Sequence, residues 1–374
     1  MTRRALVVAL SLAATLVLLE IPAYFRWIDW SGVVGMPHAV RFTHLKPWDN
    51  PANVRDEELL YRHRPLLRFT GETPGDLVDL YGIATDRRYR VDVAYDENGF
   101  RNPADRTRAD VVLIGDSFVE AGLVPLEETV AARLERSLAV PVENLGCSGY
   151  GPQQERIVLE RYGLPMQPKS VVWFFFEGND LLDVPRYDEA RRTGGQDPGR
   201  TRFLARSLVA NLARRVGLLL SRRPGEDASE ARERRAFLRS GSDRTALYFA
   251  FAAGPLTGAD RASLVRAQET IRTAAERARG AGARFLLAFV PTKFRVHEGL
   301  LELDAASRLS TWRTNELPQL LASFTAEAGI EWIDLTPPLR AAAGKGELTY
   351  FPDDGHWSPR GHAVVAAAIE ERLR

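Results

Sequence analysis

The chain has 374 residues, of which 45% are hydrophobic and 26% charged, so it can form one sizeable folded core and is not disordered throughout. Its 50 basic and 49 acidic residues leave a net charge of +1, and this balance gives no reason to expect a nucleic-acid partner. The single cysteine, Cys147, excludes an intramolecular disulfide. Without a cluster of cysteines and histidines, we expect no metal ion or cofactor.

The first 25 residues predict a signal anchor or a cleaved signal peptide. Arg3 and Arg4 precede an uncharged apolar run over 5–19, and the run to Phe25 approaches the roughly twenty residues that a bilayer requires. Because no clear cleavage site follows, we favour a single-pass transmembrane helix that anchors the chain in the cytoplasmic membrane. Arginines on the short N-terminal side would keep that end in the cytoplasm and place the rest in the periplasm or outside the cell.

Residues 26–108 predict an N-terminal extension that packs on the main domain. Prolines, aromatic residues and charges are scattered through this stretch. Near its end, Asn98 and Gly99 form a dipeptide typical of a hairpin turn between two short strands.

Strands and helices alternate from residue 109 onward. Aliphatic runs at 109–115 and 169–176 predict buried strands, and apolar residues at four-residue intervals over 126–138 predict a helix between strands. This rhythm is that of an α/β fold with a parallel, doubly wound sheet. The last helix is expected to begin at Pro359, with Ser358 as its N-cap.

An insertion interrupts this rhythm at about 183–260. Its first half predicts an amphipathic helix, and its second half is mostly charged. The apolar stripe of the helix consists of Leu204, Leu208, Leu212, Val216 and Leu219. We interpret this helix as a cap near the site, with a position on a membrane surface as the alternative.

Four polar segments follow the predicted strands, where open parallel sheets bind their ligands. They read "GDS" (115–117), "NLGCSGYG" (144–151), "EGND" (177–180) and "DDGHWSPRGH" (353–362). A serine hydroxyl needs a base to become a nucleophile, and His356 is the candidate base for Ser117. A carboxylate three residues before the histidine, Asp353, could hold its ring in the required tautomer.

In this order, the four segments resemble the blocks of the SGNH, or GDSL-like, hydrolase family over about 109–374. The segments "DENGFR" and "FVPTKFRVHEG" also look like bacterial, membrane-anchored members of that family. The resemblance implies a flavodoxin-like three-layer α/β/α sandwich. It also implies Ser117, Asp353 and His356 as the catalytic residues. The oxyanion hole would consist of the Ser117 backbone N–H, Gly149 and the Asn179 side chain.

Several of these assignments have alternatives. Asp354 lies two residues before His356, and similar polysaccharide O-acetyltransferases use that spacing in a D-x-H-W arrangement, which Trp357 completes here. We nevertheless favour Asp353. Asn179 could instead close a turn after its strand. Lys293 is expected to be a solvated loop lysine, with substrate contact as the alternative. His362 falls within the predicted last helix and is not the base.

The sequence therefore predicts a serine-dependent ester hydrolase, an esterase or deacetylase, that acts outside the cytoplasmic membrane through an acyl-enzyme. One alternative is an O-acetyltransferase that modifies an exported polysaccharide. Another is a non-catalytic glycan-binding or scaffold protein. The expected partner is a small-molecule or glycan ester, with the membrane contacted through the N-terminal helix. The oligomeric state is not predicted.

Overall fold

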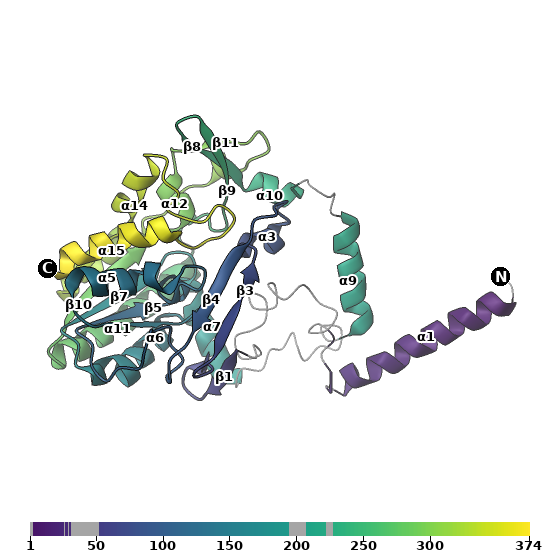
Figure 1. Cartoon of the computed structure of the whole chain (residues 1–374), viewed down its shortest axis with the longest axis horizontal. Helices are drawn as coiled ribbons and strands as arrows, with labels where there is room; N and C mark the ends of the chain where they lie inside the picture. Colours follow the sequence, from purple (N-terminus) through teal and green to yellow (C-terminus); the bar gives the residue numbers. More distant parts are fainter. Residues whose placement is uncertain (1–2, 26, 29, 31–51, 194–206, 222–226) are drawn as a thin grey trace.

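A computed structural model shows the fold of the chain (Figure 1). It describes residues 3–25, 27–28, 30, 52–193, 207–221 and 227–374. The expected Leu204 of the amphipathic stripe and most of the extension before residue 52 lie outside these ranges.

A five-stranded parallel sheet forms the centre of the main domain. The strands are β5 (Val111–Gly115), β6 (Val142–Gly146), β7 (Ser170–Phe176), β10 (Arg284–Val290) and β12 (Glu331–Asp334). They lie in the order β12-β10-β7-β5-β6, and every neighbouring pair is parallel. This is the flavodoxin-like strand order, so the predicted parallel α/β fold is confirmed.

Helices cover both faces of the sheet, and the strands β5 and β7 are therefore buried at every position. Along β5, Val112 and Ile114 join one hydrophobic cluster, and Val111 and Leu113 join the other. The first cluster packs under α6 (Pro152–Val158), α11 (Gly258–Gly280) and α13 (Leu317–Ala328). The second packs under α5 (Val130–Leu138), α14 (Thr336–Ala343) and α15 (Pro359–Leu373).

The start of α15 agrees with the sequence prediction. The Ser358 side chain accepts hydrogen bonds from the backbone N–H groups of Arg360 and Gly361, and Pro359 is the first helical residue. His362 lies in this helix and is buried. The cap fixes the point at which the preceding loop, which carries His356, joins the helix.

The insertion contains more regular structure than its charged sequence indicated. It includes α7 (Asp180–Thr193), α9 (Leu208–Ser221) and α10 (Ser229–Glu233). A hairpin of β8 (Arg235–Ser240) and β9 (Asp243–Tyr248) follows, and β11 (Glu302–Leu303) pairs antiparallel with β8. Charged residues interrupt the apolar residues of this hairpin, and Phe237 and Leu238 are adjacent, so the sequence lacks the alternation typical of a strand.

The amphipathic helix α9 does not form the expected cap near the site. It lies beside α1 (Arg3–Tyr24), away from the main domain (Figure 1). Glu20 of α1 accepts hydrogen bonds from Ser207 Oγ and from the backbone N–H of Val209 at 2.8 and 2.7 Å. Glu20 thereby satisfies one of the free backbone donors at the start of α9, and α9 contacts α1 instead of lying near the site.

The N-terminal apolar segment forms α1, but the predicted transmembrane helix is not confirmed. Among the described residues, no helix has the length and apolar character needed to cross a membrane.

The extension folds into two hairpins and a short helix. The strand β1 (Asn53–Asp56) pairs with β2 (Leu60–His63), and β3 (Arg68–Thr73) pairs with β4 (Tyr89–Ala94), both antiparallel. Between β3 and β4 lies α3 (Asp76–Tyr81).

The Asn98–Gly99 turn is present but does not join two strands. The carboxylate of Asp96 accepts the backbone N–H groups of Asn98 and Phe100, which closes the turn locally. Gly99 has φ of 87°, and a Cβ there would meet the His63 carbonyl oxygen at 2.4 Å. The dipeptide therefore serves a close approach to β2, and the hairpin expected at this position is wrong.

Gly75 marks the closest approach of the extension to the loop before α15. A Cβ on Gly75 would lie 2.1 Å from the backbone oxygen of Asp353. The backbone N–H of Leu77 donates to the same oxygen at 3.2 Å. The two segments can pack this closely because residue 75 has no side chain.

We expect Gly75→Ala to destabilise the protein by about 1–3 kcal/mol, because an added methyl group must push the two backbones apart. Gly254→Ala is a matched control, since a Cβ there would meet nothing within 4 Å and no positive φ strains it. Chemical denaturation of both variants measures the difference. Equal midpoints would show that the extension is not held at this contact.

Candidate active site

Ser117 lies directly beyond the buried end of β5. It is the first residue of the short helix α4 (Ser117–Glu120), and Asp116 caps this helix by accepting the Phe118 backbone N–H at 3.0 Å. The first N–H groups of a helix lack acceptors within the helix. The half-buried Ser117 thus offers both its hydroxyl and its backbone N–H at the carboxyl edge of the sheet.

His356 joins Ser117 to a carboxylate. Its Nε2 atom lies 2.8 Å from Ser117 Oγ, and its Nδ1 atom lies 2.7 Å from Asp354 Oδ1. A proton on Nδ1 that is donated to Asp354 leaves Nε2 free to accept the serine proton. This is the connectivity of a nucleophile, a general base and an orienting acid, formed by residues 239 positions apart.

The acid in this arrangement is Asp354, so the expected assignment of Asp353 is wrong. The buried Asp353 carboxylate points toward the extension, where Oδ1 accepts the Tyr89 hydroxyl and Oδ2 lies 3.6 Å from Arg87. In a tight turn, neighbouring side chains point in different directions, and here the second aspartate points toward the imidazole. In the sequence, Trp357 after His356 indicated this spacing, because it completes the D-x-H-W arrangement that starts at Asp354.

The ion pair changes the pKa values of both partners. Burial opposes the charge on His356, but the carboxylates of Asp354, Asp76 and Asp116 together outweigh it and raise the pKa of His356 to about 9. Burial likewise opposes the charge on Asp354, and the imidazolium nevertheless lowers the pKa of Asp354 to about 2. The neutral His356 that can accept a proton therefore becomes more abundant as pH rises toward 9.

Lys293 is buried and holds the loop that carries His356. Its Nζ atom donates to the backbone oxygens of Phe351, Pro352 and Asp354 at 2.6, 2.8 and 3.2 Å. It lies at the start of α12 (Lys293–His297), directly after the central strand β10. The lysine is neither solvated nor free to contact a substrate, so both sequence interpretations of it are wrong.

The loop after β6 carries Gly149 in an exposed turn. Gly149 has φ of 80°, which favours glycine. Glu120 of α4 accepts the backbone N–H of the preceding residue, Ser148, at 2.6 Å, and also contacts His63 Nε2 at 3.1 Å. Because β6 lies next to β5, this turn lies at the same sheet edge as Ser117.

Asn179 follows β7, the other neighbour of β5. Its Nδ2 atom donates to Asp183 Oδ2 at 2.7 Å, and its buried Oδ1 atom has no hydrogen-bond partner. A side-chain amide has two N–H donors, and the Asn179 side chain also interacts with the Asp116 carboxylate beside Ser117. The oxyanion roles of Ser117, Gly149 and Asn179 stay predictions, with all three on adjacent strand ends.

Asp76 is a site residue that the sequence did not indicate. Its backbone N–H donates to Asp354 Oδ2 at 2.8 Å, and its carboxylate accepts the Gly355 N–H at 2.9 Å. These contacts join residues about 280 positions apart, so no local sequence pattern could predict them.

Two groups of side chains within the described residues bring potential metal ligands together. They are His63, Glu120 and Cys147, and Asp76, Asp354 and His356. In the first group, the Glu120 carboxylate already accepts bonds from Tyr95, His63 and Ser148. The second is the hydrogen-bonded acid and base group beside Ser117, so neither geometry requires an ion.

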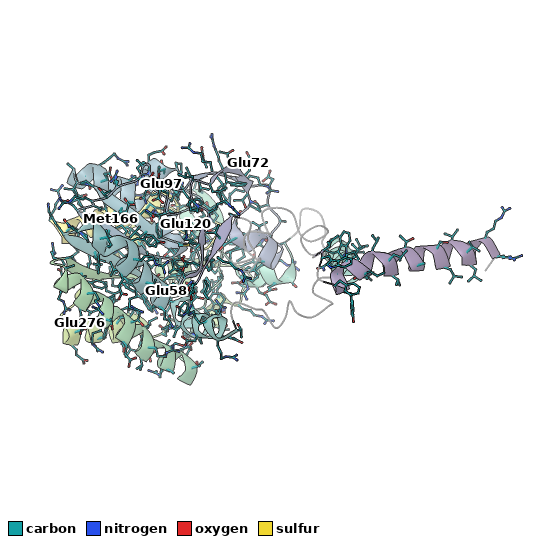
Figure 2. All side chains as sticks on the ribbon, turned by 90° about the horizontal axis from the view of Figure 1, so that it is seen from below. Glu58, Glu72, Glu97, Glu120, Met166 and Glu276 are labelled. Atoms are coloured by element: carbon teal, nitrogen blue, oxygen red, sulfur yellow. The ribbon has the colours of Figure 1, made fainter. Side chains whose placement is uncertain are left out.

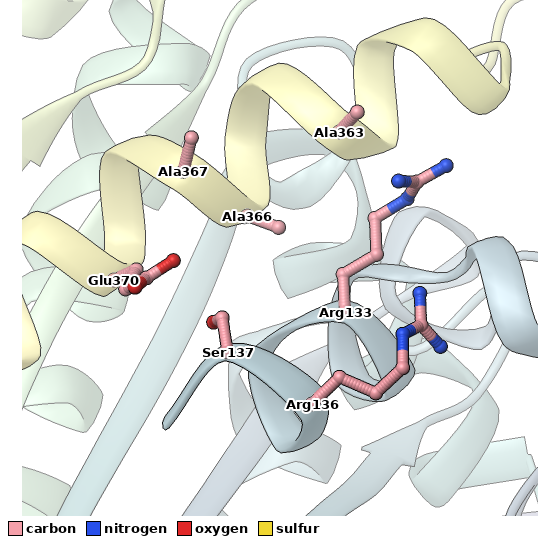
Figure 3. Close-up of a pocket in the computed structure, with 7 residues that line it drawn as sticks. All are labelled: Arg133, Arg136, Ser137, Ala363, Ala366, Ala367 and Glu370. Atoms are coloured by element: carbon pink, nitrogen blue, oxygen red, sulfur yellow. The ribbon is translucent and has the colours of Figure 1, made fainter. Parts of the chain in front are cut away.

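A pocket of about 320 Å³ lies elsewhere, between α5 and α15 (Figure 3). Its lining consists of Arg133, Arg136, Ser137, Ala363, Ala366, Ala367 and Glu370. None of these residues belongs to the hydrogen-bonded group of Ser117, His356 and Asp354, so the pocket is separate from the candidate site.

Comparison with known families gives a match for the C-terminal third of the chain. Residues 251–374 match a family described as "SGNH hydrolase-like domain, acetyltransferase AlgX". This match includes Asp354 and His356, whereas Ser117 lies before it. The match shows that residues 251–374, a third of the chain, are similar to an SGNH hydrolase-like domain. No curated protein matches the chain.

Solved structures of low sequence identity also match. A putative lipolytic protein of the G-D-S-L family from Desulfitobacterium hafniense is 15% identical, with 71% of this chain and 99% of that chain covered and a TM-score of 0.38. The lipase/acylhydrolase from Enterococcus faecalis is 14% identical, with 70% and 94% covered and a TM-score of 0.37. A catalytic mutant of Axe2, an acetylxylan esterase from Geobacillus stearothermophilus, is 12% identical, with 70% and 93% covered and a TM-score of 0.37.

We expect Asp354→Asn to lower turnover by up to roughly ten-thousandfold, because it removes the carboxylate that orients His356. Asp353→Asn should leave most turnover and instead lower the melting temperature, since it weakens the contacts with Tyr89 and Arg87. Kinetic constants and melting temperatures of both variants, taken on the same preparations, separate the two roles. A larger loss of turnover in Asp353→Asn would contradict the observed arrangement.

Proposed function

We propose that the chain carries an SGNH hydrolase-like domain and transfers acyl groups through an ester of Ser117. The observation that supports this is the continuous chain of hydrogen bonds from Ser117 Oγ through both nitrogens of His356 to Asp354. Such a chain lets the imidazole take the serine proton while the carboxylate stabilises the imidazolium.

The reaction has two halves. In the first, Ser117 Oγ attacks the carbonyl carbon of an ester, His356 takes the hydroxyl proton and then returns it to the leaving alcohol. In the second, an acceptor hydroxyl gives its proton to His356 and attacks the carbonyl carbon of the seryl ester. The bond from that carbon to Ser117 Oγ breaks, and His356 returns the proton to Ser117 Oγ. The predicted donors Ser117 N–H, Gly149 and Asn179 would stabilise the oxyanion in each half.

We infer that the acyl group is acetyl and that the acceptor is a hydroxyl of a glycan. Asp354 occupies the position two residues before the histidine, as in the D-x-H-W arrangement of similar O-acetyltransferases. The description of the matching family also names an acetyltransferase. An esterase or deacetylase, which we had favoured from the sequence, remains the second candidate because water can replace the acceptor in the same site.

To test this function, the purified protein is incubated with an acetyl-ester reporter, with and without oligosaccharide acceptors, and analysed by mass spectrometry. We expect acetylated sugar, an acetylated Ser117 peptide and phosphonate labelling of Ser117. Ser117→Ala should lower turnover by at least about a thousandfold with an unchanged melting temperature.

Free acetate without acetylated sugar would favour the esterase. Neither product, together with no labelling of Ser117, would contradict acyl transfer and favour a glycan-binding or scaffold role.

We further propose that the SGNH hydrolase-like domain lies outside the cytoplasmic membrane. The proposal depends on Arg3 and Arg4, which precede the apolar segment of α1, because arginines hold the short end of an export segment in the cytoplasm. Alkaline phosphatase fused to the C-terminus should be active in a bacterial host and inactive when both arginines and the segment 5–25 are deleted. Equal activity of the two fusions would contradict export by this segment.

A further inference from the structure

We propose that Asp76, in the N-terminal extension, is a positioning residue of the active site that acts on His356 both through the Asp354–Gly355 turn and through its own carboxylate. The proposal rests on the proposed function, in which His356 is the base. It extends the site into the N-terminal extension, because Asp76 precedes β5 by more than 30 residues.

Asp76 contacts the turn before His356 with its backbone and its side chain. Its backbone N–H donates to Asp354 Oδ2 at 2.8 Å, while Asp354 Oδ1 faces the imidazole. The Gly355 N–H donates to Asp76 Oδ1 at 2.9 Å. One residue therefore orients the acid and fixes the peptide between the acid and the base.

The second carboxylate oxygen of Asp76 faces the imidazole itself. Asp76 Oδ2 lies 3.9 Å from His356 Nδ1, and Asp354 Oδ1 lies 2.7 Å from the same nitrogen. Two carboxyl groups thus face one imidazole nitrogen. When Ser117 gives its proton to Nε2, the positive charge on the ring forms within reach of both.

Packing on both sides holds Asp76 in place. Leu77 and Val78 are buried in a cluster with Ile83, Ala231 and Tyr248, which joins α3 to the insertion. The Leu77 N–H donates to the Asp353 oxygen at the contact that Gly75 permits. The Asp76 side chain therefore points at the turn because its neighbours are fixed, and not because of a chance rotamer.

The charged and titratable groups around this pair come from several elements. They are Asp353 and Asp354 in the same loop as His356, Asp116 beside Ser117, Tyr81 in α3, Lys293 in α12, Arg87 before β4 and His362 in α15. Lys293 is the buried cation among them, and it donates to backbone oxygens of the loop.

The charges of Asp76, Asp354 and His356 depend on one another. Burial and the neighbouring Asp354 carboxylate raise the pKa of Asp76 to about 8, and the imidazolium opposes this rise. Asp76 in turn adds to the effect of Asp354 in raising the pKa of His356. The three groups therefore titrate together, and removal of the Asp76 charge must lower the pKa of the imidazole.

The test compares Asp76→Asn with the wild type in the pH dependence of kcat/KM. The amide keeps an oxygen for the Gly355 N–H and keeps the backbone contact to Asp354, but it removes the charge. His356 must be neutral to act as base, and the variant should lower its pKa. We therefore expect the acidic limb of the kcat/KM profile, where activity rises with pH, to move to lower pH by about one unit or more. We also expect the plateau at high pH to fall about tenfold, since the imidazolium loses one of its two anionic neighbours.

Two further variants complete this comparison. Asp76→Ala also loses the acceptor for Gly355, so its limb should move in the same way and its plateau should fall further. Glu72→Gln removes an exposed carboxylate of the same extension at the edge of the molecule (Figure 2), and it should leave the profile unchanged. A lower melting temperature without a moved limb in either Asp76 variant would show a merely structural role and overturn the proposal.

A second readout does not depend on turnover. The imidazole resonances of His356 are followed by NMR from pH 5 to 10 in Ser117→Ala, with and without Asp76→Asn, and assigned by their loss in His356→Gln. We expect a lower His356 pKa in the double variant, and an unchanged pKa would overturn the proposal. A shifted His356 pKa in these variants, together with wild-type protein that forms no acyl-enzyme with the acetyl-ester reporter, would refute the proposed function alone, because the contact with Asp76 would still be established.

Discussion

The site depends on three backbone carbonyls that converge on one buried ammonium. Phe351, Pro352 and Asp354 point their oxygens at Lys293 Nζ, and burial lowers the pKa of this lysine to about 7 while the nearby Asp354 carboxylate opposes the change. Unpaired carbonyls at this depth would each carry a desolvation cost of about 1–3 kcal/mol. Lys293 follows β10 closely, so the position of this strand in the sheet fixes the position of the loop that carries His356.

The two aspartates of this loop, Asp353 and Asp354, point in different directions and have different partners. Asp353 binds Tyr89 and Arg87 of the extension, so its charge holds the loop against that segment. Asp354 is then free to face the imidazole, with its second oxygen held by the Asp76 N–H. The turn can therefore use adjacent acids because each has partners on a different side, and exchange of their roles would require the whole turn to rotate.

The sequence was sufficient for features that depend on local patterns. Apolar runs and four-residue spacing located the strands and helices of the parallel sheet, and turn chemistry located Ser358 as a cap. Ser117 was identified because it follows a buried strand, and His356 because it lies in the loop directly before the capped last helix. The pattern could not choose between Asp353 and Asp354, or find the role of Lys293 or Asp76, because their partners lie about 58 to 278 positions away. The β8–β9 hairpin was missed because charged residues interrupt its short apolar segments.

The extension contacts the site on both sides of Ser117. On one side, Asp76 meets Asp354 and Gly355. On the other, His63 of β2 pairs with Glu120, which holds the Ser148 N–H and thereby the turn of Gly149. Burial opposes the charges of this pair, yet the neighbouring acidic groups raise the pKa of His63, and the imidazolium lowers the pKa of Glu120, so the carboxylate stays ionised as an acceptor. The extension therefore belongs to the same structural unit as the acid, the base and the predicted oxyanion loop, although it precedes the first strand of the sheet.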